Sequence, residues 1–187
     1  MLEKRLVEQA APTMAAIEVG SLFPYVPDAG ENIYSRLEQW NRDFAKKGIR
    51  TVVIKECSEH SSTLLLYTYR PAMMQKILDR ADSKTFLMQY GYEKDFSLGE
   101  YLQMLSARLC PENPFPHEIG LFLGYPLEDV MGFIANKGSN YLCCGHWKVY
   151  ANREQAEKQF TRFRRCTKIF CESYNSGISI NQLTVAV

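Results

Sequence analysis

The stretch that decides the fold reads FPHEIGLFLGYPLEDV and spans residues 115–130. The proline at its second position suits the start of a helix, where its missing N–H leaves no bond unmade, and Gly124 predicts the end of that helix. Pro126 then begins a second helix, whose first turn carries Glu128 and Asp129, favourably placed against the helix dipole. The pattern predicts two short helices that meet at a Gly-Tyr-Pro corner and bury their apolar faces.

The composition around this stretch is that of an ordinary globular protein. Apolar residues make up 46% of the 187 residues and charged residues 23%, which excludes an intrinsically disordered chain. The length predicts a single domain over residues 1–187. The 22 basic and 21 acidic residues leave a net charge of +1. So balanced a chain predicts neither nucleic acid nor an anionic membrane as a partner.

The N-terminus and the cysteines indicate a cytoplasmic protein. The first residues are charged and lack the continuous apolar core of a signal peptide. No apolar run approaches the ~18 residues of a membrane span. The six cysteines include no CxxC pair, so neither a zinc ribbon nor a thioredoxin-type redox motif is indicated. In the cytoplasm these thiols would be reduced.

Apolar periodicity and turn residues predict an α+β fold with a mostly antiparallel sheet of about four strands covered by helices. Residues 23–27, with two prolines, are predicted to be a rigid connector. Capping boxes are predicted at Asp28 and at Ser97, each with a glutamate three residues on. Helices are predicted from residues 2, 28, 72, 97, 116, 126 and 152, and strands over 49–56, 62–70, 141–150 and 178–187, with 62–70 at the centre of the sheet.

The predicted strand 141–150 carries the densest set of reactive side chains. Alternation along a strand would place Cys144, His146, Lys148 and Tyr150 on one face and Trp147 on the other. A thiol, an imidazole, an ammonium and a phenol in one row are unusual for a purely structural face. We expect this face to meet the His-Glu turn of the opening stretch and to form a pocket there.

The expected pocket suggests a small anionic ligand, a carboxylate or a phosphate. Helix N-termini attract anions because their N–H groups are unpaired, and Arg70 and Lys148 would bind the negative charge. His117 or Glu118 would transfer a proton if the protein is an enzyme. The alternative for His117 and Glu118 is a purely structural role at a helix start, in which Glu118 compensates the helix dipole. Arg70, beside Pro71, is equally a candidate for a structural ion pair, and His146 for an ordinary surface or hydrogen-bonded histidine. The sequence identifies no cofactor, since no GxGxxG motif follows a strand.

Two other classes of function fit the same residues. The first is a non-enzymatic interaction or regulatory module with a protein partner and no polar pocket. The second is a thiol or metal site drawn from Cys144, His146, His117 and Glu118, although their spacing matches no strong metal signature. A helix-turn-helix around Gly124 is a weaker option, because acidic side chains at the start of the second helix would repel phosphates.

Taken together, the motifs resemble a bacterial family that is known only as a domain of unknown function. The resemblance rests on FPHEIGLFLGYPLEDVMGFI at 115–134 followed by Gly145 and Trp-Lys-Val-Tyr at 147–150, and it extends over the whole chain. In the family a cysteine often stands where this chain has Ala10, so the resemblance implies no thiol role there. The family often has an aromatic residue where this chain has His146, which argues against a shared metal role. The resemblance implies short proteins of anaerobic bacteria and no established activity.

Overall fold

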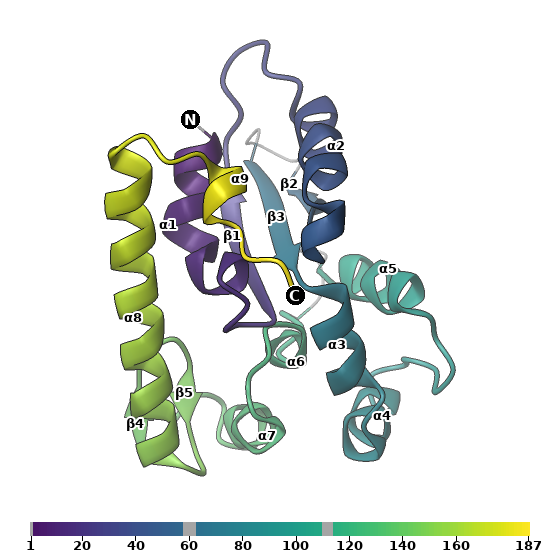
Figure 1. Ribbon diagram of the computed structural model, residues 1–187. Coiled ribbons are helices and arrows are strands. Elements are labelled where there is room, and N and C mark those ends of the chain that lie inside the picture. Colours follow the sequence, from purple (N-terminus) through teal and green to yellow (C-terminus); the bar gives the residue numbers. More distant parts are fainter. Residues whose placement is uncertain (1, 58–62, 110–113) are drawn as a thin grey trace. The chain divides into compact units, whose positions relative to one another are not determined.

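The computed structural model describes residues 2–57, 63–109 and 114–187 (Figure 1). It contains helices, a three-stranded antiparallel sheet and a separate two-stranded ribbon, which confirms the α+β class. The chain divides into two compact units. The first unit consists of residues 1–73 and 165–187, and the second of residues 74–164. The single domain expected over residues 1–187 stays a prediction.

The first unit is built on the sheet β1-β3-β2, with β1 at Gly20–Tyr25, β2 at Arg50–Cys57 and β3 at Thr63–Tyr69. Both pairings are antiparallel. The predicted hairpin of β2 and β3 and the central place of β3 are confirmed; the connection predicted at 58–61 lies outside the described residues. The connector predicted over 23–27 is wrong in part, because β1 runs through Pro24. An edge strand tolerates proline, since one side of its backbone needs no donor.

The helices of the first unit cover the strands at the sheet's edges. α1 (Leu2–Met14) packs on β1, and α2 (Ile33–Asp43) packs on β2. α2 begins at Asn32, whose side chain accepts from the Ser35 N–H, so the helix start predicted at Asp28 is wrong. From α2, Asn41 donates to the Thr51 carbonyl and accepts from the Thr51 N–H, both at 2.9 Å. This side-chain amide therefore caps part of the outer edge of β2.

Arg70 follows β3 directly, and its buried guanidinium donates four hydrogen bonds to main-chain carbonyls. It is 1% exposed, and burial lowers the pKa of its guanidinium from the ordinary value. Nε donates to the Thr13 carbonyl and Nη2 to the Met14 carbonyl, both at 2.7 Å. Nη1 reaches the Lys47 carbonyl and Nη2 the Val185 carbonyl, both at 2.9 Å. The ligand-binding role predicted for Arg70 thus gives way to a structural one, because the buried guanidinium presents no surface to a ligand.

Within the first unit, further hydrogen bonds beside those of Arg70 hold the C-terminal segment. The strand predicted over 178–187 is wrong: the segment forms α9 (Ile180–Leu183), which begins with a capping box of Ser179 and Gln182. Lys47 is the last residue of the 3-10 helix η1 (Ala45–Lys47), and its ammonium donates to the Thr184 carbonyl at 2.8 Å. The Val185 N–H donates to the Met14 carbonyl at 3.0 Å.

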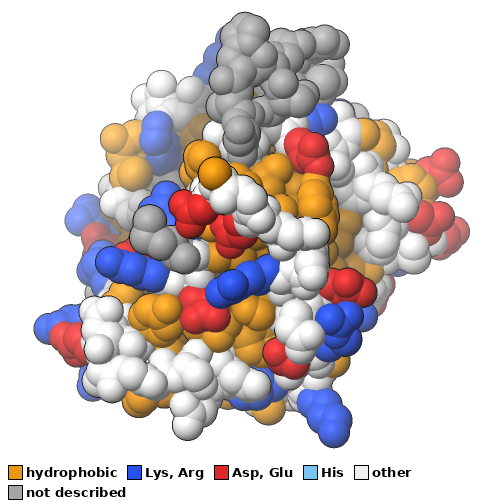
Figure 2. Space-filling model, turned by 90° about the horizontal axis from the view of Figure 1, so that it is seen from above, with side chains coloured by type: hydrophobic (Ala, Val, Ile, Leu, Met, Phe, Trp, Pro, Cys, Tyr) orange, Lys and Arg blue, Asp and Glu red, His pale blue; other side chains and the backbone are white. Residues whose placement is uncertain are grey.

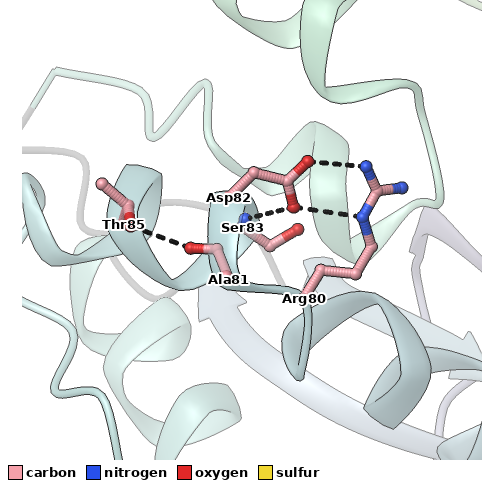
Figure 3. Close-up of polar contacts among 5 residues, drawn as sticks. All are labelled: Arg80, Ala81, Asp82, Ser83 and Thr85. Carbon is pink, nitrogen blue, oxygen red and sulfur yellow. Dashed lines mark hydrogen bonds and ion pairs between the residues drawn. The ribbon is translucent and has the colours of Figure 1, made fainter.

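The second unit is mostly helical. Its helices are α4 (Ala81–Met88), α5 (Leu98–Arg108), α6 (Ile119–Phe122) and α7 (Leu127–Ala135), together with most of α3 (Pro71–Leu78) and the first half of α8 (Arg153–Asn175). The capping box predicted at Ser97 and Glu100 is confirmed. At the start of α4, Asp82 accepts two hydrogen bonds from the Arg80 guanidinium and one from the Ser83 N–H (Figure 3).

The strand predicted over 141–150 folds back on itself. β4 (Cys143–Cys144) pairs antiparallel with β5 (Lys148–Val149), with Cys144 opposite Lys148. The turn passes close to α8: a Cβ on Gly145 would lie 2.3 Å from the Phe160 ring. Only glycine fits so near the ring. Residues 141–150 therefore form a hairpin, and the alternation that predicted one continuous reactive face is wrong. The predicted sheet of about four strands is instead three strands and this ribbon.

The surface shows mixed charge. On the face in Figure 2, Lys and Arg side chains are interspersed with Asp and Glu side chains, in line with the net charge of +1. Of the described helices, none combines the length and the apolar character that crossing a membrane would require.

Replacement of Arg70 is expected to destabilise the protein strongly. In R70M the carbonyls of Thr13, Met14, Lys47 and Val185 lose a charged donor, and each buried bond of this kind contributes about 1–3 kcal/mol. Urea unfolding should show a loss of about 3 kcal/mol or more. R50M, which removes an exposed arginine in β2, should change the free energy of unfolding by less than about 0.5 kcal/mol. Equal stability of R70M and R50M would contradict the structural role of Arg70.

A mostly buried carboxyl group makes the stability of the protein pH-dependent. Glu18, between α1 and β1, accepts hydrogen bonds from Ser21 (3.0 Å) and Thr13 (3.3 Å), yet burial raises its pKa from 4.5 to about 7. The folded state then binds more protons than the unfolded state between these values, so stability falls as the pH rises through that window. The free energy of unfolding of E18Q, relative to that of the wild type, should increase by up to about 3 kcal/mol between pH 4.5 and pH 8. A difference that stays constant over this range, measured by urea unfolding, would refute the raised pKa.

Candidate functional site

The Gly-Tyr-Pro corner is held by a buried carboxylate rather than shaped for catalysis. Asp129, in the first turn of α7, is buried and accepts three hydrogen bonds. The Trp147 indole Nε1 and the Tyr150 N–H donate to it at 2.7 Å, and the Ala151 N–H at 3.0 Å. These bonds join the opening stretch to the segment 147–150. The two stretches that carry the family resemblance are thus one packing unit.

Aromatic and glycine contacts complete this packing unit. The Trp147 ring stacks on Tyr125 at 4.9 Å and meets the Phe160 ring edge-on at 4.6 Å. A Cβ on Gly132 would lie 2.5 Å from the Tyr150 side chain, so α7 can approach that ring only with glycine at this position. Most of the stretch 115–130 is therefore explained by folding.

Glu118 has a different partner from the one its sequence position suggests. It is 1% exposed, so its carboxylate is inside the second unit. The Arg108 Nε, at the end of α5, donates to Glu118 Oε1 in an ion pair. The Tyr92 hydroxyl donates to the same oxygen at 3.4 Å, and burial together with Glu118 raises the pKa of Tyr92. Glu118 therefore orients Arg108, and its predicted role in proton transfer would require it to break this pair.

Arg108 lies at a pocket of about 410 Å³. Its side chain keeps 30% of its surface exposed, although its partner Glu118 is buried. The guanidinium lies 5.4 Å from the centre of the Tyr90 ring, and the pairing with Glu118 raises its pKa. This cavity, called the Arg108 pocket below, is lined by Tyr90, Arg108, Pro114, Phe115, His117, Glu118 and Ile134.

His117 is exposed and lies on a row of rings that leads out of the pocket. Its imidazole is 5.7 Å from the Phe115 ring and 4.9 Å from the Phe133 ring. On the other side, the Lys148 ammonium lies 5.7 Å from Phe133 and 4.9 Å from Tyr141. Phe115, His117, Phe133, Lys148 and Tyr141 are called the aromatic row below. His117 and Lys148 thus both lie near Phe133, and the pocket expected between the His-Glu turn and this part of the chain stays a prediction.

The remaining candidates from 141–150 have structural surroundings. Lys148 donates to the Gly138 carbonyl at 2.7 Å. The His146 ring packs against Phe160 and Phe163 of α8, and burial beside these rings lowers its pKa. Cys144 is exposed. The structure thus places these side chains in a hairpin, and their predicted roles in ligand binding stay predictions.

Tyr150 differs from its neighbours in having an unpaired polar atom. Its hydroxyl oxygen is buried and has no hydrogen-bond partner among the described residues. Burial raises the pKa of this phenol. The ring itself is needed for the close packing on Gly132. The role of Tyr150 in ligand binding stays a prediction.

The described residues do not support the alternative metal site. They contain no group of three or more His, Cys, Asp or Glu side chains placed to hold an ion. Cys144 and His146 lie in the β4–β5 ribbon, and Glu118 is engaged by Arg108. The set drawn from the sequence thus has no common geometry in the described part of the chain.

Sequence reasoning missed Arg108, the cation of this pocket. A basic residue in the last turn of a helix is ordinarily explained by the helix dipole, so its position at the end of α5 gave no functional signal. Its partner Glu118 lies ten residues away, across a segment with three prolines. Only the tertiary structure brings the two charges together.

The Asp129 contacts predict a specific effect of D129N. The amide keeps one acceptor oxygen for three donors, so at least one buried N–H loses its partner, which costs about 1–3 kcal/mol. The indole N–H resonance of Trp147 should move upfield, whereas that of Trp40, in the first unit, should not move. The exposed neighbour provides the control, because E128Q should leave both resonances unchanged. An unchanged Trp147 resonance in D129N would exclude the bond.

Comparison with known proteins places the chain in a family. No curated protein and no solved structure matches it. The family described as "Protein of unknown function (DUF3793)" matches residues 6–184, which includes both units and the packing unit around Asp129. This extent confirms the resemblance to a domain of unknown function, and the chain belongs to the DUF3793 family.

Proposed function

We propose that the protein is a cytosolic binding protein for a small anionic ligand, which occupies the Arg108 pocket. The observation that carries the proposal is a partly exposed guanidinium held from behind by a buried carboxylate. A guanidinium has five N–H donors in a planar fork, and the Glu118 bond through Nε uses one edge of it. A carboxylate or phosphate fits such a fork in a bidentate way.

The surroundings of Arg108 favour a bound anion over a bare surface ion pair. Glu118 is desolvated and immobilised, so Arg108 loses little conformational freedom when a ligand arrives. The apolar side chains of Phe115 and Ile134 line the same cavity as the guanidinium, and apolar walls beside a charge strengthen electrostatic attraction. A volume of about 410 Å³ lies in the range of small-molecule sites.

His117 supplies the chemistry that goes beyond binding. It is exposed, lines the pocket and makes only ring contacts in the described part of the chain. Its imidazole can donate to an anion or exchange a proton with it. If the protein is an enzyme, His117 is the acid–base group, and Glu118 acts by orienting Arg108. The helix start at Pro116 adds little, since α6 has four residues.

Titration of the protein with inorganic phosphate and with succinate tests the proposal. The chain has three histidines, so H117Q assigns the imidazole resonances of His117 in proton NMR spectra. These resonances should shift saturably with at least one of the two anions. The double variant R108Q/E118Q removes the cation without leaving a buried charge, and it should weaken binding about tenfold or more.

A matched pair on the surface of α8 controls for general charge effects. R153Q/E157Q removes an exposed Arg–Glu pair from the same unit and should leave the affinity unchanged. If neither anion shifts the His117 resonances, or if both double variants weaken binding equally, the proposed function is wrong.

A further inference from the structure

The aromatic row at the mouth of the Arg108 pocket bears on the kind of anion that binds. Phe115 is 56% exposed, although it is among the largest apolar side chains. It contacts His117, and His117 contacts Phe133. Single exposed apolar side chains are normal on protein surfaces. Rings in series that begin inside a pocket beside a cation are a more specific arrangement.

The geometry of these rings suits a planar partner. The Phe115–His117 and His117–Phe133 planes are tilted by 52° and 58°, so the row presents both faces and edges. Aromatic rings bind one another through offset faces or through edges. At the far end, the Lys148 ammonium bonds the Gly138 carbonyl and lies near Phe133 and Tyr141, which holds that part of the row in place.

The cation and the rings are joined by two shared residues. Phe115 and His117 belong both to the aromatic row and to the lining of the Arg108 pocket. A ligand whose anionic group reaches Arg108 therefore has Phe115 and His117 within the same cavity. A small aliphatic anion would leave these rings exposed to water.

We infer that the ligand is an aromatic ring that carries a phosphate or carboxylate group. The ring packs on Phe115 and His117, and the anionic group pairs with Arg108. This inference rests on the proposed function and narrows it to a class of ligand. A nucleic-acid strand is a poorer fit, because the pocket holds one cation already paired with Glu118 and the chain has a net charge of only +1.

Two matched pairs of probes test the inference: AMP against ribose 5-phosphate, and benzoate against acetate. Each pair shares its anionic group and differs in the ring. Affinities come from the His117 resonances, as above. The aromatic member of at least one pair should bind about tenfold more tightly than its partner, because stacking on aromatic side chains contributes about that much per ring. Adenosine, which lacks the phosphate, should bind at least about tenfold more weakly than AMP.

Variants separate the ring contact from the anion contact. F115L keeps an apolar side chain and should remove most of the tenfold preference for the aromatic member of the pair. M131A, which truncates another half-exposed apolar side chain of the same unit, should leave the preference intact.

The outcomes distinguish the two proposals. Equal affinities within both pairs, or a preference that F115L does not reduce, overturn the aromatic class while the anion site stands. Binding of adenosine as tight as that of AMP overturns the anionic part. If none of the four anions binds, the proposed function itself fails.

Discussion

The first unit depends on one buried cation. Arg70 donates four hydrogen bonds to main-chain carbonyls, two of them at the C-terminal end of α1, where the helix dipole is negative. The same guanidinium holds the 3-10 helix through Lys47 and the C-terminal segment through Val185. A buried charge without such partners would be strongly unfavourable. One side chain at the end of β3 therefore connects helix, sheet and tail, and it cannot also serve a ligand.

The second unit uses a carboxylate for the same purpose. Asp129 accepts hydrogen bonds from one indole and two main-chain N–H groups. These bonds join the corner at 124–126 to the hairpin of β4 and β5. Since folding accounts for Asp129, Trp147 and the close glycines, the characteristic residues of the chain are mostly structural. The functional surface that we propose consists of groups that this packing does not use, namely the exposed side of Arg108, His117 and the rings beside them.

The sequence predicts a helix or strand correctly where residues within that element carry the signal. The capping box at Ser97, the branched residues of β2 and the continuous apolar run of β3 each predict their element without tertiary information. β1 was missed because Pro24 within it and Pro27 after it indicate a connector unless the strand's place at the sheet edge is known. The fold-back at Gly145 was missed because period-two alternation is shared by a strand and a tight hairpin. The partners of Arg70 and of Arg108 lie far away in the sequence or across a break, so no spacing could reveal them.

A crystal structure with 4-bromobenzoate bound would test the central claim most directly, because bromine gives an anomalous signal that identifies both the place and the direction of the ring. The account predicts an anomalous peak beside Phe115 and His117, with the carboxylate within hydrogen-bond distance of the Arg108 guanidinium and the Arg108–Glu118 pair intact. An empty Arg108 pocket at saturating ligand, or a ring bound with its carboxylate turned away from Arg108, would contradict it.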